Sequence, residues 1–308
     1  MKLALALAAG AMLVGAATAH ALRLPTAPKC PIFPVDNAWN QRVDALPVAA
    51  NSAQLIASMG NSGLHADFGS GLYEGSPIGI PFDVVSKKTP RAKVSFDYAD
   101  ESDRVGYPIP KTVHIEGGRQ SDGDRHALLL DKDACKLYEL FALYPKGAAW
   151  SAGSGAVWNL RTDKLRPAGW TSADAAGLPI FPGLARYDEV ARGAITHALR
   201  FTAQHTRKQF VYPARHYASS SDDASLPPMG LRVRLKATVD ISGFPKQTRI
   251  VLQALKTYGM ILADNGSNWF VSGAPNPKWS NDDLHSIGRI TGSMFEVVDT
   301  SSLPHPGQ

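Results

Sequence analysis

One stretch near the middle of the chain decides the fold class. It reads His126-Ala127-Leu128-Leu129-Leu130, then Asp131-Lys132-Asp133, then Lys136-Leu137-Tyr138-Glu139-Leu140-Phe141-Ala142-Leu143. Two largely apolar runs on either side of a short polar turn are typical of a β-hairpin. We therefore predict two antiparallel strands over residues 126–130 and 136–143.

Strand-like segments outnumber helical ones along the rest of the chain. The helical candidates are residues 51–59, 187–192 and 245–257, and the last of these is followed by Gly259 as a stop. Because strands and helices do not alternate regularly, we predict a β-rich fold, mainly β with some α, built as a two-sheet β-sandwich or jelly roll with a few peripheral helices. The other strand candidates are residues 93–98, 112–116, 194–203, 209–212, 231–239, 258–263 and 269–272.

The first 21 residues have the pattern of a secretory signal. Lys2 precedes an apolar stretch over residues 3–14, and Ala19-His20-Ala21 is a small-x-small cleavage pattern. The apolar stretch is too short to span a bilayer, which takes about 20 apolar residues, and no later segment approaches that length. We predict a signal peptide over residues 1–21, one globular domain over 22–300 and a flexible tail over 301–308.

Because a signal peptide directs export, we predict that the protein is secreted or periplasmic and does not span a membrane. A cut after Ala19 would instead expose His20 as the N-terminal residue. An N-terminal histidine of this kind resembles the copper brace of lytic polysaccharide monooxygenases, whose other sequence features the chain lacks.

Composition and motifs exclude several function classes. The hydrophobic share of 44% and the charged share of 19% are ordinary for a globular protein. The net charge is +5, and Lys and Arg are scattered rather than grouped in a basic stripe, so we predict no nucleic-acid partner. The sequence has no G-x-S-x-G elbow, P-loop, dinucleotide-binding fingerprint or H-E-x-x-H motif, which disfavours serine-hydrolase, nucleotide-binding and zincin functions.

The two cysteines, Cys30 and Cys135, fit an oxidising compartment. A pair so far apart has neither the spacing of metal ligands nor that of a redox motif. In an exported protein such a pair normally forms a structural disulfide, so we predict a Cys30–Cys135 bond.

The candidate catalytic residues come from three motifs in which a histidine and a carboxylate stand two positions apart. They are His65-Ala66-Asp67, His114-Ile115-Glu116 and Asp124-Arg125-His126. Positions i and i+2 of a strand point to the same face, so the two groups of a pair would project together. An imidazole and a carboxyl that meet can tune each other's pKa and transfer protons.

A Gly-rich turn over residues 117–123 would fold His114 and Glu116 back towards Asp124 and His126. We predict that at least two of the three pairs face one cleft together with a loop tryptophan. The alternative is that each pair is a local ion pair on a solvated face. We predict no cofactor, although imidazole and carboxylate ligands leave a divalent metal open.

Glu139 is a further catalytic candidate. On a strand it shares a face with Leu137 and Phe141, which would hold its carboxyl against apolar neighbours. Burial raises the pKa of a carboxyl, as a general acid requires. The alternative is an edge-strand residue that reaches water.

Aromatic and polar residues in loops indicate a glycan partner. Several of the six tryptophans stand among Gly, Ser, Asn and Asp. Flat aromatic faces beside hydrogen-bonding groups suit a sugar-binding cleft, whereas ordinary core anchoring is the alternative. The candidate substrate-binding residues are Trp170, Asp174, Arg215, His216, Tyr217 and Trp269.

Three segments resemble a family of uncharacterised secreted bacterial and fungal proteins. They are the run from Gly169 to Glu189, the motif Pro228-Met229-Gly230-Leu231-Arg232, and the run from Tyr258 to Gly266. The resemblance covers most of the chain after the signal peptide. It implies export and a single domain, and it assigns no activity or catalytic residue.

Two function classes remain open at this point. The first is a secreted polysaccharide-degrading enzyme: a glycoside hydrolase would pair Glu116 with Glu139 or Asp124, whereas a lyase would use Arg215, His216 and Tyr217. The second is a non-catalytic glycan-binding or cell-envelope protein. We favour the enzyme because a binding module seldom needs a chain of this size. The partner is then a polysaccharide or cell-wall glycan, and the sequence leaves its linkage and the oligomeric state open.

Overall fold

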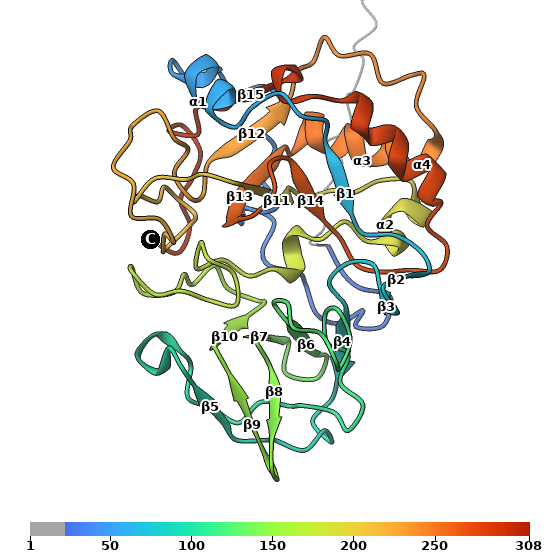
Figure 1. The fold of residues 1–308 in the computed structure, drawn as a ribbon, viewed down its shortest axis with the longest axis vertical. Helices are drawn as coiled ribbons and strands as arrows, with labels where there is room; N and C mark the ends of the chain where they lie inside the picture. Colours follow the sequence, from blue (N-terminus) through green and yellow to red (C-terminus); the bar gives the residue numbers. More distant parts are fainter. Residues whose placement is uncertain (1–21) are drawn as a thin grey trace, which may run out of the picture.

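The computed structural model describes residues 22–308, so the predicted signal peptide and His20 lie outside the described residues. Within these residues the protein is rich in strands, with several sheets and few helices (Figure 1). The upper half of Figure 1 combines the N-terminal part of the chain with its C-terminal third, and the green middle of the chain forms the lower half.

The upper half is built on a six-stranded mixed sheet with the order β1–β14–β11–β13–β12–β15. Strands β1 and β14 are parallel although about 200 positions separate them, so this edge of the sheet forms only through tertiary pairing. The strands are β1 (His65–Asp67), β14 (Phe270–Ser272), β11 (Leu199–Ala203), β13 (Met260–Asn265), β12 (Arg232–Leu235) and β15 (Phe295–Val297).

The lower half contains a four-stranded sheet, a three-stranded sheet and a small hairpin. The first has the order β10 (Ser154–Asn159), β7 (Lys136–Phe141), β6 (Ala127–Asp131) and β4 (Phe82–Val85). The second has the order β5 (Val94–Phe96), β9 (Ala149–Ala152) and β8 (Tyr144–Lys146), and the hairpin pairs β2 (Leu72–Tyr73) with β3 (Ser76–Pro77).

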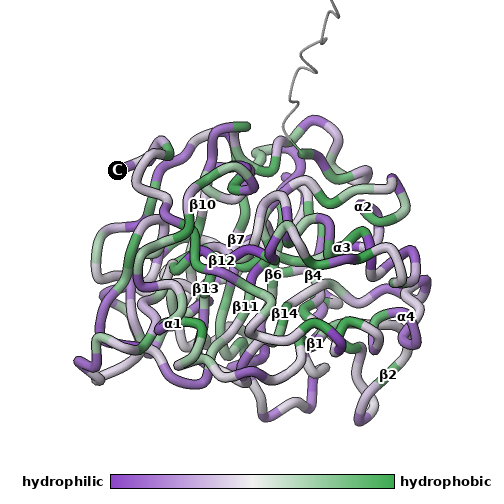
Figure 2. The backbone as a smooth tube through the Cα atoms, turned by 90° about the horizontal axis from the view of Figure 1, so that it is seen from above, coloured by the Kyte–Doolittle hydropathy of each residue, from purple (hydrophilic) through white to green (hydrophobic). Residues whose placement is uncertain are grey.

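The predicted hairpin is confirmed as the antiparallel pair β6–β7. Its sheet is covered on both faces, which explains the uninterrupted apolar run in β6. Leu128, Leu130 and Leu137 pack into the large core shared with the six-stranded sheet. Leu129 and Leu140 point the other way, into a smaller core against the three-stranded sheet. In the tube view, many of the outer turns are hydrophilic (Figure 2).

The helices lie at the periphery, as the sequence predicts. Helix α2 ends at Gly193, which has a left-handed φ of 94°. At Gly259, just past α3, a Cβ atom would lie 2.2 Å from the Val233 carbonyl oxygen, so only glycine fits there. The helices are α1 (Ser52–Ser58), α2 (Tyr187–Arg192), α3 (Lys246–Thr257) and α4 (Asn281–His285), with short 3-10 turns η1 (Ala99–Glu101), η2 (Phe181–Gly183), η3 (Ser286–Arg289) and η4 (Gly292–Met294).

Two strand predictions are wrong. Residues 112–116 are not a strand, because the backbone amide of His114 donates to the Asp83 carboxylate instead of to a neighbouring strand. Residues 209–212 contribute only an isolated bridge, between Phe210 and Met229, and Pro213 next to it has no amide hydrogen to continue a ladder. The strand-rich class is confirmed, while the sheets are not closed and the sandwich or jelly-roll arrangement stays a prediction.

The segment predicted as a flexible tail contacts the body of the protein. The Gln41 side chain donates to the Pro304 carbonyl at 2.8 Å, and Tyr212 Oη donates to that of Pro306 at 3.2 Å. The Tyr212 ring stacks on His305 at 4.2 Å between ring centroids. The flexibility of residues 301–308 stays a prediction.

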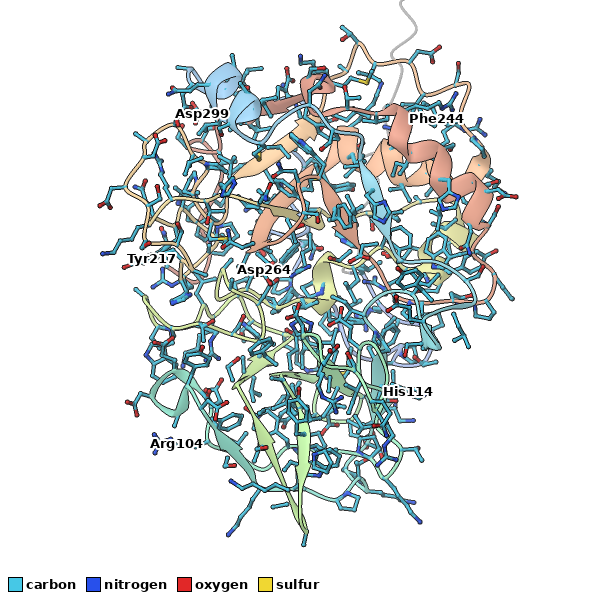
Figure 3. All side chains as sticks on the ribbon, in the orientation of Figure 1. Arg104, His114, Tyr217, Phe244, Asp264 and Asp299 are labelled. Atoms are coloured by element: carbon cyan, nitrogen blue, oxygen red, sulfur yellow. A yellow bond between two sulfur atoms is a disulfide. The ribbon has the colours of Figure 1, made fainter. Side chains whose placement is uncertain are left out.

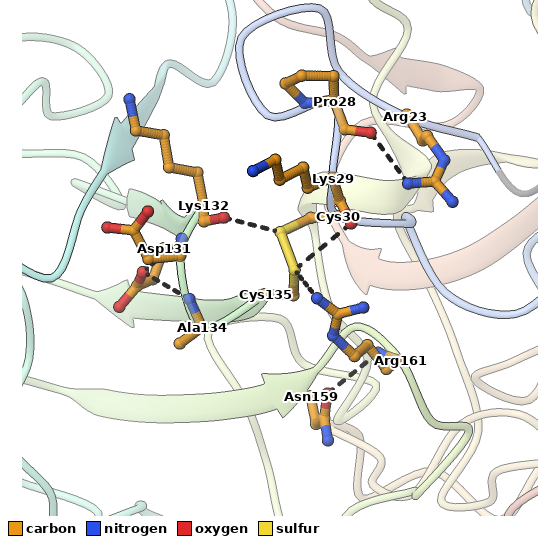
Figure 4. The surroundings of a disulfide bond; sticks show 11 residues. Arg23, Pro28, Lys29, Cys30, Asp131, Lys132, Ala134, Cys135, Asn159 and Arg161 are labelled. Carbon is orange, nitrogen blue, oxygen red and sulfur yellow. Dashed lines mark hydrogen bonds between the residues drawn. A yellow bond between two sulfur atoms is a disulfide. The ribbon is translucent and has the colours of Figure 1, made fainter.

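The predicted disulfide is present. Cys30 and Cys135 are bonded, with 5.1 Å between their Cα atoms, and both are buried (Figure 4). The bond ties the N-terminal segment to the turn between β6 and β7. It closes a loop of 105 residues, so the chain-entropy model assigns it about 4–5 kcal/mol of stability.

Replacing both cysteines, as Cys30→Ala with Cys135→Ala, is expected to lower the melting temperature by on the order of 10 °C. The reason is the larger conformational entropy of the unfolded chain. Differential scanning calorimetry measures the shift. Reductant should lower the melting temperature of the unaltered protein in the same way and leave the double variant unchanged. Two free thiols in the unaltered protein would contradict the assignment.

Candidate functional site

Arg200 is the centre of a buried polar group on the six-stranded sheet. Its neighbours Leu199 and Phe201 on β11 are fully buried, and Arg200 itself is only 4% exposed. Its Nε and one terminal nitrogen donate to the two carboxylate oxygens of Asp174, at 2.7 and 2.8 Å. This two-pronged pair compensates a charge that would otherwise be very costly to bury.

The guanidinium also holds two side chains from neighbouring strands. It donates to Ser272 Oγ on β14 at 2.5 Å and to Asp264 on β13 at 3.1 Å. Asp264 reaches this face because the β11–β13 register shifts after Phe201, so that Thr202 pairs with Asp264. A bulge of this kind changes the direction of one side chain, here that of Asp264. Figure 3 labels Asp264 at the junction of the upper and lower halves.

Burial raises the pKa of the Asp264 carboxyl to about 7, and the nearby negative charge of Asp174 adds to this effect. Arg200 opposes the rise without cancelling it.

Asp67 lies next to this polar group, on the edge strand β1 of the same sheet. In the parallel β1–β14 register Asp67 stands beside Ser272, and His65 stands beside Phe270. Residues two apart on a strand share a face, so all four side chains project from the same face.

Glu116, Asp124 and His126 meet on the opposite side of the junction. His126 Nδ1 lies 2.5 Å from Glu116 Oε2, and its Nε2 lies 2.9 Å from the Ala173 carbonyl oxygen. Arg125, between Asp124 and His126, has a positive φ of 51°. Its buried guanidinium donates to the carbonyls of Arg119, Ser121 and Leu143 and so holds the Gly-rich turn in place.

Both nitrogens of His126 carry a proton in this arrangement. A carbonyl oxygen can only accept, so Nε2 donates to Ala173, while the Glu116 carboxylate accepts from Nδ1. Burial lowers the pKa of His126, but the charge and hydrogen bond of Glu116, together with the charge of Asp124, outweigh it and raise the pKa to about 9. Burial raises the pKa of Glu116, but the charge and hydrogen bonds of His126, together with the charge of Arg200, outweigh it and hold that pKa below its ordinary value.

Asp67 and Glu116 line one open cavity of about 660 Å³, which we call the Glu116 cavity. Its other walls are residues 73–79, which include the tip of the β2–β3 hairpin, and the turn over 117–122. The Ser76 hydroxyl donates to the Gly117 carbonyl and joins the two walls. Asp67 is itself exposed, but desolvation by the surrounding protein, and then the negative charge of Glu116, raise the pKa of its carboxyl above the ordinary value.

Glu139 is fully buried on β7 and does not line this cavity. The backbone amides of Ile180 and Phe181 each donate to one of its carboxylate oxygens at 2.8 Å. Burial raises its pKa to about 8, although these two hydrogen bonds oppose the rise. The predicted apolar environment is therefore present, but the carboxyl has no exposed surface through which to reach a substrate.

Among the described residues, Glu116, Asp124 and His126 are also the group that best fits a metal ion. Each offers one ligand atom, and these atoms lie within 4.8 Å of one another. A ligating imidazole must be neutral, however, and here the nitrogen that faces the carboxylates is protonated. A divalent cation would have to displace that proton and the hydrogen bond to Glu116.

His114 does not join the cluster that the sequence predicts. Its Nδ1 lies 2.7 Å from Asp83 Oδ1, its side chain is 68% exposed, and it lines a separate apolar cavity beside Phe82. Figure 3 labels it in the lower half, away from Asp264. Because residues 112–116 are not a strand, the expected shared face of His114 and Glu116 does not form.

The tryptophans contribute less to a binding surface than the sequence suggests. Trp269 is 1% exposed and stacks between Phe201 and Phe295, so it anchors the core. Trp170 is half-buried beneath the guanidinium of Arg166. No tryptophan is among the described residues that line the Glu116 cavity, so the predicted loop tryptophan is not part of it.

The other predicted substrate-binding residues serve local structure. Asp174 is fully buried against Arg200. Arg215 Nε donates to the Arg166 carbonyl, His216 Nδ1 donates to that of Ala175, and Tyr217 stacks beside His216. The structure places this triplet outside the Glu116 cavity.

Arg200, Asp264 and Ser272 are not among the predicted site residues, and Asp67 belongs to a His/carboxylate motif to which no catalytic role is assigned. One signal was available: Arg200 stands alone between Leu199 and Phe201 in an apolar strand, and a charge in such a position requires a buried partner.

No protein-family model, no curated protein and no solved structure matches the chain. Across residues 22–308, none of the helices has the length and apolar character needed to cross a membrane.

Removing one member of the central ion pair is expected to destabilise the fold strongly. Asp174→Asn removes the two-pronged carboxylate partner of the buried Arg200 guanidinium and leaves it only the single ion pair with Asp264, at a cost of about 3–5 kcal/mol by urea denaturation. The double variant Arg200→Met with Asp174→Leu should lose less than Asp174→Asn, because the guanidinium is removed together with its main partner and the Asp264 carboxyl can take up a proton. A cost below about 1 kcal/mol for Asp174→Asn would contradict the central role of the pair.

The raised pKa of Glu139 predicts a pH-dependent stability. The ordinary pKa is 4.5 and the folded value about 8, so the folded state holds a proton that the unfolded state releases. The contribution of this proton to the free energy of unfolding is complete below about pH 4.5 and is lost as the pH rises through about 8.

Glu139→Gln removes this titration. We expect the variant to be less stable than the unaltered protein by about 1–3 kcal/mol at pH 5, because its amide nitrogen faces a backbone donor. The difference should narrow towards pH 9, where only the unaltered protein has lost stability. Urea denaturation at several pH values measures both, and the exposed Glu74→Gln serves as control. A difference that is constant with pH would refute the assignment.

Proposed function

We propose that this protein is an exported glycan-degrading hydrolase whose catalytic carboxyls are Asp67 and Glu116. The observation that carries the proposal is that these two groups line one open cavity while their pKa values move in opposite directions. Two carboxyls whose environments separate their pKa values are the usual basis for dividing the roles of acid and base.

The surroundings of the two carboxyls support a division of their roles. Glu116 stays ionised beside the His126 imidazolium, so it acts as the base or nucleophile. Asp67 keeps its proton to a higher pH and acts as the general acid that protonates the leaving oxygen. His126 is a positioning residue, because it fixes one oxygen of Glu116 and leaves the other available. These roles replace the pairing of Glu116 with Glu139 or Asp124 that the sequence suggests.

Several features support a glycan over other substrates. The cavity is open and its lining is about evenly polar and apolar, with backbone of the Gly-rich turn on one side and the exposed Tyr73 on the other. An aromatic face beside many hydrogen-bonding groups suits a sugar. Neither cysteine is available as a nucleophile, because both are in the disulfide. The disulfide is also consistent with export.

The lyase alternative has less support, because Arg215 and His216 direct their side chains to backbone carbonyls. A non-catalytic glycan-binding protein remains the second candidate. It needs the cavity but not the opposite pKa shifts of its two carboxyls.

The test is release of reducing ends from a panel of polysaccharides. Glu116→Gln and Asp67→Asn should each lower kcat by about 10²-fold or more, the usual contribution of a general acid or base. Activity should fall on the acid side as Glu116 is protonated, below its ordinary range, and on the alkaline side as Asp67 ionises, above its ordinary range. Asp67→Asn should lose the alkaline limb. Asp97→Asn, at an exposed carboxyl outside the cavity, is the matched control.

Two results would count against the proposal. Glycan binding without product release, unchanged by Asp67→Asn, would favour the binding protein. Activity that chelator abolishes and a divalent cation restores would instead make Glu116, Asp124 and His126 a metal site.

A further inference from the structure

A second cavity adjoins the Glu116 cavity. It has a volume of about 530 Å³ and shares three lining residues with the first, namely Asp67, Tyr73 and Ile78. We call it the His65 cavity, after the residue that lines it together with Phe270 and His285. Asp67 thus stands at the boundary between two cavities, with space for a ligand on both sides.

The strand register fixes what lies beyond Asp67. His65 and Asp67 are two apart on β1, and Phe270 and Ser272 are their partners on β14. Two residues of strand span about 7 Å, so the His65–Phe270 pair lies about one pleat repeat away from Asp67 on the same face. The two rings stack with 4.1 Å between their centroids.

The exposed His65 ring lies over the face of the half-buried Phe270 ring, and both residues line the second cavity. We call this stack the platform, and its flat surface is the face of His65 that Phe270 does not cover. Tyr73, 69% exposed on β2, belongs to the wall that both cavities share. His285, exposed on the C-terminal end of α4, adds a hydrogen-bonding group.

We propose that the His65 cavity is a saccharide subsite, and that the substrate is a polymer that crosses Asp67 and is cleaved within its chain. The inference rests on the proposed function and adds to it the substrate class and the mode of attack. A platform of rings with polar groups at its edge binds the apolar face of a sugar ring and its hydroxyls. Because the second cavity continues beyond Asp67, a chain can extend past the acid in both directions, and internal bonds can then reach the two carboxyls.

A third cavity, which holds His114, does not take part in this subsite. It meets the Glu116 cavity only at Pro77 and is lined mainly by apolar residues, including five prolines. It supplies a matched control, because Leu72 lines it while the adjacent Tyr73 lines the other two. The two side chains are similarly exposed, at 66% and 69%.

The experiment compares His65→Ala, Tyr73→Ala and Leu72→Ala on a polysaccharide that the protein cleaves and on its oligosaccharides. His65→Ala and Tyr73→Ala should raise KM for long oligosaccharides about tenfold, or about 1.4 kcal/mol. The rise in KM should be smaller for the shortest oligosaccharide that is cleaved. Leu72→Ala should match the unaltered protein. Viscosity should fall well before reducing ends accumulate, as internal cleavage requires. Phe270→Leu, which removes the ring under His65 but keeps an apolar side chain, should raise KM in the same way.

The outcomes separate this inference from the proposed function. If the protein is active and Asp67→Asn is inactive, but His65→Ala and Tyr73→Ala behave like Leu72→Ala, the subsite is refuted and the hydrolase stands. Release of single units from chain ends without loss of viscosity refutes internal cleavage. If glycans bind without being cleaved, calorimetric titration tests the subsite alone, with the same tenfold weakening expected. Failure to bind any glycan overturns both proposals.

Discussion

The structure depends on compensating one buried charge, that of Arg200. A guanidinium in the middle of an apolar strand is tolerated only when its charge and hydrogen bonds are satisfied. Asp174, from the segment between β10 and β11, supplies both oxygens for this purpose. The same guanidinium binds Ser272 and Asp264, so one residue connects three strands and the segment above the four-stranded sheet. These bonds cross-link the strands of the face on which Asp67 stands.

Two carboxyls that line one cavity nevertheless have pKa values shifted in opposite directions. Glu116 bonds directly to His126, and the positive charge of Arg200 also lowers its pKa. Asp67 feels Arg200 too, but desolvation and the negative charge of Glu116 outweigh it. The difference therefore arises from a single placement, that of His126 against Glu116 rather than against Asp67. A tightly held turn is needed to keep that placement, and the carbonyls bound to Arg125 provide it.

Local sequence patterns predicted the parts of the fold that depend on neighbours in the chain. The β6–β7 hairpin, helix α2 with its Gly193 stop and the meeting of Glu116 with His126 across a ten-residue turn are of this kind. The pairing of β1 with β14 brings together residues about 200 positions apart, and no local pattern specifies it. Asp67 could not be placed beside Glu116 for that reason. Trp269 was misplaced because its polar sequence neighbours resemble an exposed loop, whereas Phe201 and Phe295 enclose the ring.

The position of β1 at the edge of its sheet connects the fold to the proposed substrate. An edge strand has one side without a partner strand, so a ligand can lie alongside it. Because a strand is straight and its side chains alternate, residues two apart repeat at about 7 Å along one face. His65 and Asp67 use this repeat to place a platform and an acid in line. A compact ligand would gain nothing from two cavities in a row, whereas an extended chain contacts both at once and distributes its binding energy around the bond that is to be broken.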